Sequence, residues 1–144
     1  MELDRLFADY GALDASVKYF QGKFSYTYDD KGRIAVPAEF RSVLDTIQPE
    51  SSVLALTLWR EDDLVGIEAF PELFFNVEAR LINMSDPKRR HEFGTKYFLI
   101  TIDNQGRILI PQYLAKEADL TKGCRMTIDG NTETFVFYRT NPKS

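Results

Sequence analysis

Residues 24–37 read FSYTYDDKGRIAVP, and residues 98–111 read FLITIDNQGRILIP, 74 positions further along the chain. Seven of the 14 aligned pairs are identical, namely Phe24/Phe98, Thr27/Thr101, Asp29/Asp103, Gly32/Gly106, Arg33/Arg107, Ile34/Ile108 and Pro37/Pro111. Two copies are too few for a solenoid, in which a row of repeats stacks into one continuous core. The duplication therefore predicts two equivalent halves related by a pseudo-two-fold axis.

Each copy predicts a strand, a tight turn, a second strand and a short helix. β-Branched and aromatic residues on both sides of the turn are typical of strands. In the turn, the Asp carboxylate can accept hydrogen bonds from nearby backbone N–H groups, and the Gly can adopt a positive φ without steric cost. The closing Pro suits the first position of a helix, which predicts helices at about 37–45 and 111–118.

Two hairpins and two helices are expected outside the repeat. The hairpins pair Val53–Trp59 with Leu64–Phe70, and Cys124–Ile128 with Thr134–Tyr138 about the turn Asp129-Gly130-Asn131. One helix begins at Pro71, where apolar residues recur at helical spacing. Another helix has Asp86 as its N-cap and Pro87 as its first residue. These elements together predict an α+β fold.

The chain carries 18 Lys and Arg against 22 Asp and Glu, a net charge of −4, which excludes a uniformly basic coat for nucleic acid. Its one Cys, Cys124, cannot form an intramolecular disulfide, and neither it nor the single histidine, His91, has neighbours at zinc-ligand spacing. The apolar runs are far shorter than the roughly 20 residues that span a bilayer. We expect one soluble cytoplasmic unit of 144 residues, with no metal and no membrane segment.

The sequence resembles the MraZ family, which is built from two domains of the SpoVT/AbrB swapped-hairpin type. The stretches that carry the resemblance are Tyr19-Phe20-Gln21-Gly22, Asp29-Asp30-Lys31-Gly32-Arg33, Pro37-Ala38-Glu39-Phe40-Arg41, Ser85-Asp86-Pro87 and Asp103-Asn104-Gln105-Gly106-Arg107-Ile108-Leu109-Ile110-Pro111. The resemblance implies a duplicated swapped-hairpin β-barrel with pseudo-two-fold symmetry. Its domains would be residues 19–70 and 97–144, with connecting helices at 71–96 and an N-terminal extension at 1–18.

The resemblance also implies a function, that of a transcriptional regulator of the bacterial division and cell-wall gene cluster. Such a protein forms a homo-oligomeric ring that binds direct repeats in double-stranded DNA near its own promoter, in the nucleoid.

The extension at residues 1–18 would place its apolar residues on one face of a helix. Two interpretations of this extension remain open, a packing or partly disordered appendage and an oligomer contact.

The duplicated Arg33 and Arg107 also have two interpretations. In the first, each guanidinium forms a fork-to-carboxylate pair with the Asp of its own turn, supported by the turn Gly. These supporting residues are Asp29, Gly32, Asp103 and Gly106. In the second, a rigid hairpin end presents Lys31 and Arg33, and likewise Gln105 and Arg107, to DNA phosphates or to guanine O6 and N7 in the major groove. Both hold together if the Asp aims the Arg.

Other functions are weaker candidates. A protein-interaction or scaffold ring, in which the paired turns are purely structural, is the alternative function. A catalytic dyad formed by Asp29 and Asp103 is disfavoured, because neither Asp lies in the sequence Asp-Thr/Ser-Gly that such dyads usually have. An Arg four residues after each Asp would also keep that Asp ionised. We therefore expect no enzyme activity, cofactor or small-molecule substrate. The basic run Lys88-Arg89-Arg90-His91 is interpreted as a solvated helix face.

Overall fold

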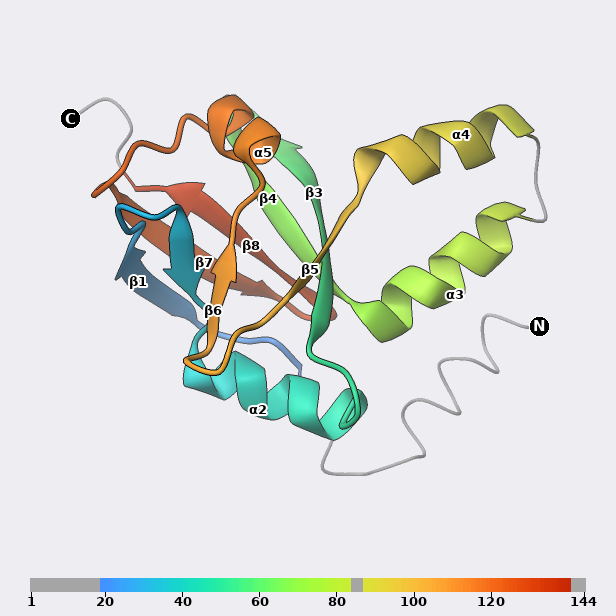
Figure 1. Cartoon of the computed structure of the whole chain (residues 1–144), viewed down its shortest axis with the longest axis horizontal. Helices are drawn as coiled ribbons and strands as arrows, with labels where there is room; N and C mark the ends of the chain where they lie inside the picture. The colour runs from blue at the N-terminus through green and yellow to red at the C-terminus, as the bar shows by residue number, and fades with distance from the viewer. Residues whose placement is uncertain (1–18, 84–86, 141–144) are drawn as a thin grey trace.

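The computed structural model describes residues 19–83 and 87–140 (Figure 1). The predicted helix face of the N-terminal extension and the predicted Asp86 cap lie outside these residues. In chain order, the elements are β1 (Lys23–Thr27), β2 (Arg33–Ala35), α2 (Ala38–Ile47), β3 (Val53–Glu61), β4 (Leu64–Pro71), α3 (Glu72–Asn83), α4 (Pro87–Lys96), β5 (Phe98–Thr101), β6 (Arg107–Leu109), α5 (Gln112–Glu117), β7 (Arg125–Asn131) and β8 (Thr134–Arg139). The mixed α+β class is confirmed.

Six strands form one antiparallel sheet in the order β1-β7-β8-β4-β3-β5. The two hairpins expected outside the repeat are present as β3–β4 and β7–β8, and they form the middle of this sheet. The helices α3 and α4 connect β4 to β5 and project together from one side of the molecule (Figure 1). The remaining strands, β2 and β6, pair with each other in a separate antiparallel ribbon, the β2–β6 ribbon.

The β2–β6 ribbon corrects the expectation that each turn ends a hairpin within its own copy. β1 pairs with β7 and β5 pairs with β3, whereas the strands that follow the two turns pair across the copies. Local pattern could not decide this pairing, because β2 and β6 are only three residues long and their partners lie far away in the sequence. The exchange joins the two copies into one unit.

Gly130 lies within β7 and not in a turn, so the turn expected at Asp129-Gly130-Asn131 is wrong in position. The reversal occurs instead after Asn131, where Thr132 takes a φ of 61°. A Cβ on Gly130 would lie 2.6 Å from the backbone nitrogen of Gln21, and the Gly130 N–H donates to the carbonyl of Gly22 at 2.8 Å. Glycine is therefore present because another segment of backbone crosses β7 at this point.

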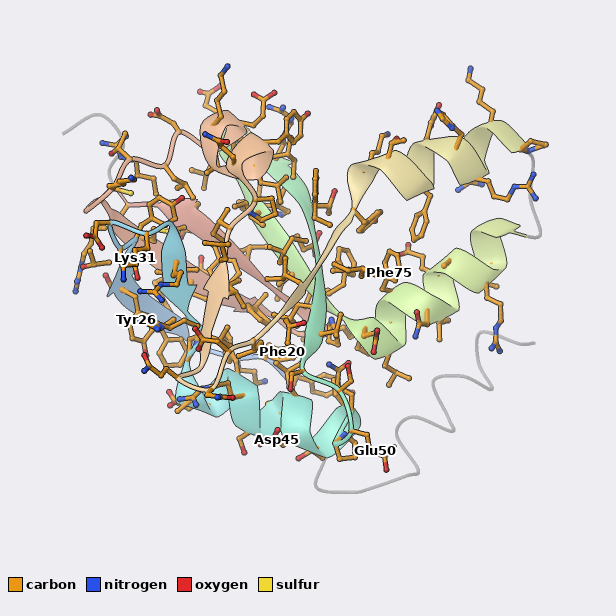
Figure 2. All side chains as sticks on the ribbon, viewed as in Figure 1. Phe20, Tyr26, Lys31, Asp45, Glu50 and Phe75 are labelled. Carbon is orange, nitrogen blue, oxygen red and sulfur yellow. The ribbon has the colours of Figure 1, made fainter. Side chains whose placement is uncertain are left out.

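One hydrophobic core holds the inner face of the β2–β6 ribbon against the large sheet and α2. Ile34 and Ile108, the central residues of the two ribbon strands, are each 1% exposed and belong to this core. Phe40 of α2 packs against Phe20 and Phe135, with ring centroids 5.3 and 5.0 Å away. Figure 2 shows Phe20 near the middle of the molecule. The ribbon therefore rests on a rigid base and turns its other face outward.

Candidate nucleic-acid interface

The first turn is built around the carboxylate of Asp29. Its Oδ1 accepts hydrogen bonds from the backbone N–H groups of Lys31 and Arg33 at 2.9 and 2.8 Å. The backbone closes the same turn, because the Asp29 N–H donates to the Arg33 carbonyl at 2.9 Å. Gly32 takes a φ of +80°, which a residue with a Cβ rarely adopts. The predicted role of the Asp and Gly in this turn is confirmed.

The second turn repeats this geometry. Oδ1 of Asp103 accepts the N–H groups of Gln105 and Arg107 at 2.8 and 2.9 Å, and Gly106 takes a φ of +76°. The Asp103 N–H donates to the Arg107 carbonyl at 2.8 Å. The duplication in the sequence is therefore matched by a duplicated set of hydrogen bonds to the backbone N–H groups of the two turns.

Each arginine also contacts the carboxylate of its own turn, but through Nε alone. Nε of Arg33 lies 3.1 Å from Oδ2 of Asp29, and Nε of Arg107 lies 3.4 Å from Oδ2 of Asp103. The second contact is an ion pair only, because its geometry does not meet that of a hydrogen bond. The fork-to-carboxylate pair expected from the sequence is thus wrong in detail. Within residues 19–83 and 87–140, the Nη groups of both arginines have no hydrogen-bond partner.

These contacts keep both carboxylates ionised. Desolvation is the largest effect on the pKa of Asp29 and raises it, but the N–H donors and the Arg33 guanidinium together outweigh it and lower the pKa below its usual value. For Asp103, the backbone N–H of Arg107 is the largest cause of a lowered pKa. Each turn therefore holds a negative charge that restrains the inner end of its guanidinium and leaves the outer end available.

Reciprocal hydrogen bonds lock the two turns to each other. The N–H of Val36 donates to the Gly106 carbonyl at 2.8 Å, and the N–H of Ile110 donates to the Gly32 carbonyl at 3.0 Å. Between these two bonds lies the β2–β6 ribbon, in which Arg33 faces Leu109. The turns consequently sit at opposite ends of one short ribbon and cannot move independently.

The outer face of the β2–β6 ribbon carries both arginines. Side chains alternate between the two faces of a strand, so the outward positions are those on either side of the buried Ile34 and Ile108. They are Arg33 and Leu109 at one end, and Ala35 and Arg107 at the other. Residues diagonal to each other in an antiparallel pair have Cα atoms about 7–8 Å apart. The two arginines therefore arise from one small surface.

The outer face is accessible to a partner. The side chains of Arg33 and Arg107 are 26% and 28% exposed, so neither guanidinium is enclosed in the interior. Lys31 and Gln105, the other two predicted contact residues, are exposed on the turns at the ends of the ribbon. Figure 2 shows Lys31 on the turn between β1 and β2. The four predicted residues thus lie on the β2–β6 ribbon and on the two turns at its ends.

Arg41 of α2 is not among the predicted contact residues, although it is one of the cations near the first motif in the sequence, and it also belongs to this surface. A Cβ on Gly106 would lie 2.7 Å from Cζ of Arg41, so the Arg41 guanidinium lies against the second turn. Its Nε also donates to the Val36 carbonyl at 3.2 Å. The equivalent position in the second copy is Ala115, which gives the first turn no such neighbour. The sequence shows Arg41 as a cation close to the first motif, but not that it lies against the second turn.

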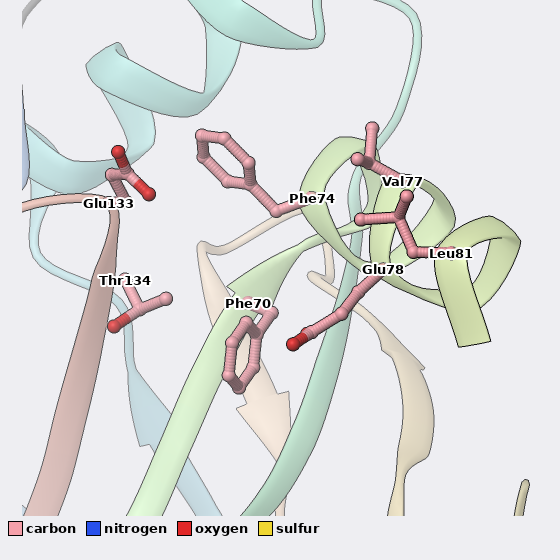
Figure 3. A pocket seen from close by; sticks show the side chains of 7 residues that line it. All are labelled: Phe70, Phe74, Val77, Glu78, Leu81, Glu133 and Thr134. Carbon is pink, nitrogen blue, oxygen red and sulfur yellow. The ribbon is translucent and has the colours of Figure 1, made fainter. Parts of the chain in front are cut away.

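Two other features lie away from the β2–β6 ribbon. The basic run Lys88-Arg89-Arg90-His91 is exposed on α4, on the other side of the molecule in Figure 1, as expected for a solvated helix face. A pocket of about 210 Å³ lies between α3 and the start of β8 (Figure 3). Most of its lining is apolar, and it consists of Phe70, Phe74, Val77, Glu78, Leu81, Glu133 and Thr134. At its edge the Thr134 hydroxyl donates to the Glu68 carboxylate at 2.6 Å.

No group of three or more His, Cys, Asp or Glu side chains gathers as a metal site would require in the part of the chain that the structure describes. Over the same residues, no helix is both long and apolar enough to cross a membrane.

Comparison with known proteins identifies the family, although no family model matches the chain. The transcriptional regulator MraZ of Syntrophobacter fumaroxidans is 33% identical over 109 residues, which cover 72% of this chain and 69% of that protein. The MraZ regulators of Oenococcus oeni and Thermoanaerobacter sp. are 30% and 35% identical and cover 78% and 70% of this chain. All three relatives are named as transcriptional regulators. The chain belongs to the MraZ family of transcriptional regulators.

Proposed function

We propose that the chain is a DNA-binding transcriptional regulator that places the outer face of its β2–β6 ribbon in the major groove. The observation that carries this proposal is the pair of arginines on that face, each restrained at Nε by its own Asp while its Nη groups point to no described partner. A major groove admits a two-stranded ribbon, and a guanidinium fork matches the O6 and N7 acceptors of guanine. Lys31, Gln105 and Arg41 would add contacts at the ribbon ends, chiefly to phosphates.

The finer proposal is a homo-oligomeric ring that acts on the bacterial division and cell-wall gene cluster. It would bind direct repeats in double-stranded DNA near its own promoter, in the cytoplasm at the nucleoid. Residues 19–70 and 97–144 would be two SpoVT/AbrB-like domains forming one swapped-hairpin β-barrel, joined by the helices at 71–96. The net charge of −4 supports an oligomer, because one protomer offers few cations to a polyanion. Linking several weak sites raises avidity by roughly 10²–10⁴.

A gel-shift experiment tests the proposal. The purified chain is titrated against the DNA upstream of its own gene and against the same fragment with its repeats scrambled. We expect preferential binding to the natural fragment, stronger binding as repeats are added, and a salt dependence that steepens by about 0.9 for each phosphate contacted. Equal binding to both fragments, or binding to neither, would overturn the proposal and favour the protein-interaction ring.

A further inference from the structure

Leu109 is unusual on the outer face of the β2–β6 ribbon, because a large apolar side chain is left 58% exposed among cations. It faces Arg33 across the ribbon and lies two residues from Arg107 along β6. Single exposed apolar residues are common on proteins and usually need no explanation. Leu109 differs because it lies beside Arg33 on the surface proposed to enter the major groove.

The Leu109 side chain lies against the first turn. A Cβ on Gly32 would lie 3.7 Å from Cδ1 of Leu109, so this methyl group lies over the first turn. The Ile110 N–H, next along the chain, donates to the Gly32 carbonyl and fixes the strand against that turn. Leu109 therefore stands on a backbone position that is fixed relative to the first turn and to Arg33.

The equivalent position in the first copy carries a much smaller side chain. Ala35 matches Leu109 at the repeat spacing and faces Arg107 across the ribbon. One end of the ribbon thus presents an arginine beside a leucine, and the other presents an arginine beside an alanine. A two-fold surface suits a palindromic site, whereas these unequal ends suit a site with a direction.

We propose that Leu109 is a specificity-determining residue that contacts the 5-methyl group of a thymine next to the base or phosphate bound by Arg33. This inference rests on the proposed function. The thymine methyl is the apolar group that a T·A pair presents in the major groove, where the neighbouring arginines would hold the DNA by charge. Contact between Leu109 and this methyl group removes apolar surface of both groups from water. Each methyl group buried in this way raises the affinity roughly fourfold.

The test compares two forms of the upstream duplex, one containing thymine and one containing deoxyuridine at every thymine position. Deoxyuridine lacks only the methyl group, so base pairing and charge are unchanged. Wild type, Leu109→Ala and Leu99→Ala are titrated against both duplexes by fluorescence anisotropy. Leu99 is the matched control, because it is a leucine exposed to a similar extent, 56%, on β5 outside the ribbon. Circular dichroism and light scattering check the fold and the oligomeric state.

We expect wild type and Leu99→Ala to bind the thymine duplex about fourfold or more tightly than the deoxyuridine duplex. Leu109→Ala should bind both duplexes equally, at the affinity of wild type for deoxyuridine DNA. The inference is overturned if wild type does not discriminate, if Leu109→Ala still discriminates, or if Leu109→Ala changes the oligomeric state and thereby shows that Leu109 contacts another copy. If wild type fails to distinguish the upstream duplex from its scrambled form, the proposed function fails and this inference fails with it.

Discussion

Asp29→Asn removes the charge of a turn carboxylate while keeping an oxygen in nearly the same place. The Asn oxygen can still accept the N–H groups of Lys31 and Arg33. Its NH₂ group, however, would replace the oxygen that now lies 3.1 Å from Nε of Arg33. Two donors would then face each other, so we expect the Arg33 guanidinium to leave its present position.

The expected loss of stability is small, because the Arg33 and Asp29 side chains are 26% and 29% exposed. A partly solvated ion pair contributes about 1 kcal/mol or less. In a chain of 144 residues, a loss of this size lowers Tm by about 3 °C. The effect on DNA binding should be larger, since a freed guanidinium must be ordered again in every protomer. Ordering one side chain costs about 1 kcal/mol, which weakens each contact about fivefold.

If net charge alone mattered, Asp29→Asn would bind DNA more tightly than wild type, because the variant lacks a negative charge beside a polyanion. Asp30→Asn is the matched control, since Asp30 is exposed on the same turn and has no hydrogen bond or ion pair with the described residues. Both variants are titrated by fluorescence anisotropy against the upstream duplex and its scrambled form. Asp29→Asn should bind the upstream duplex at least about fivefold more weakly and lose discrimination, whereas Asp30→Asn should keep it. Unchanged or tighter specific binding by Asp29→Asn would refute the aiming role of the carboxylate.

Three further predictions address the site and the fold. Arg33→Lys keeps the charge but loses the planar fork, so anisotropy should show about tenfold weaker binding to the upstream duplex and unchanged binding to the scrambled one. Because the pKa values of Asp29 and Asp103 are lowered in the folded state, the two carboxylates stabilise the fold fully above about pH 4. This contribution to the free energy of unfolding is lost as the pH falls through the folded-state pKa values. Thermal melts of the Asp29→Asn/Asp103→Asn variant should therefore lose less Tm between about pH 5 and pH 3 than those of wild type; an equal loss would contradict this. In urea unfolding, Gly130→Ala should lower the free energy of unfolding by about 1–3 kcal/mol, because the new Cβ would collide with the backbone at Gln21. Gly94→Ala, on α4 where no atom lies nearby, should raise the free energy of unfolding by about 0.5–1 kcal/mol.

Local features of the fold were predictable from the sequence because short-range physical chemistry determines them. An Asp followed three residues later by Gly indicates a turn whose carboxylate accepts N–H groups, and both turns have this structure. Alternation around Ile34 and Ile108 places the neighbouring arginines on the opposite face from the core. To this extent the candidate site follows from the sequence.

Long-range pairing could not be predicted in the same way. The partner of β2 is β6, and no local signal distinguishes this pairing from a hairpin with β1. Gly130 has the sequence environment of a turn, yet its absent side chain serves the close approach of the backbone near Gln21. Arg41 joins the surface only because the exchange brings the second turn against α2. Each of these features depends on a contact between distant segments.

We expect the arginines of the β2–β6 ribbon, and not positive charge in general, to carry DNA binding. Two variants that lose equal charge distinguish these alternatives. Arg33→Ala/Arg107→Ala changes the ribbon, and Lys88→Ala/Arg90→Ala changes the exposed face of α4. Both are titrated against the upstream and scrambled duplexes, with circular dichroism as the check on folding. We predict that the folded ribbon variant loses its preference for the upstream duplex while the α4 variant retains it. Equal losses in both variants, or full preference in the folded ribbon variant, would contradict the claim.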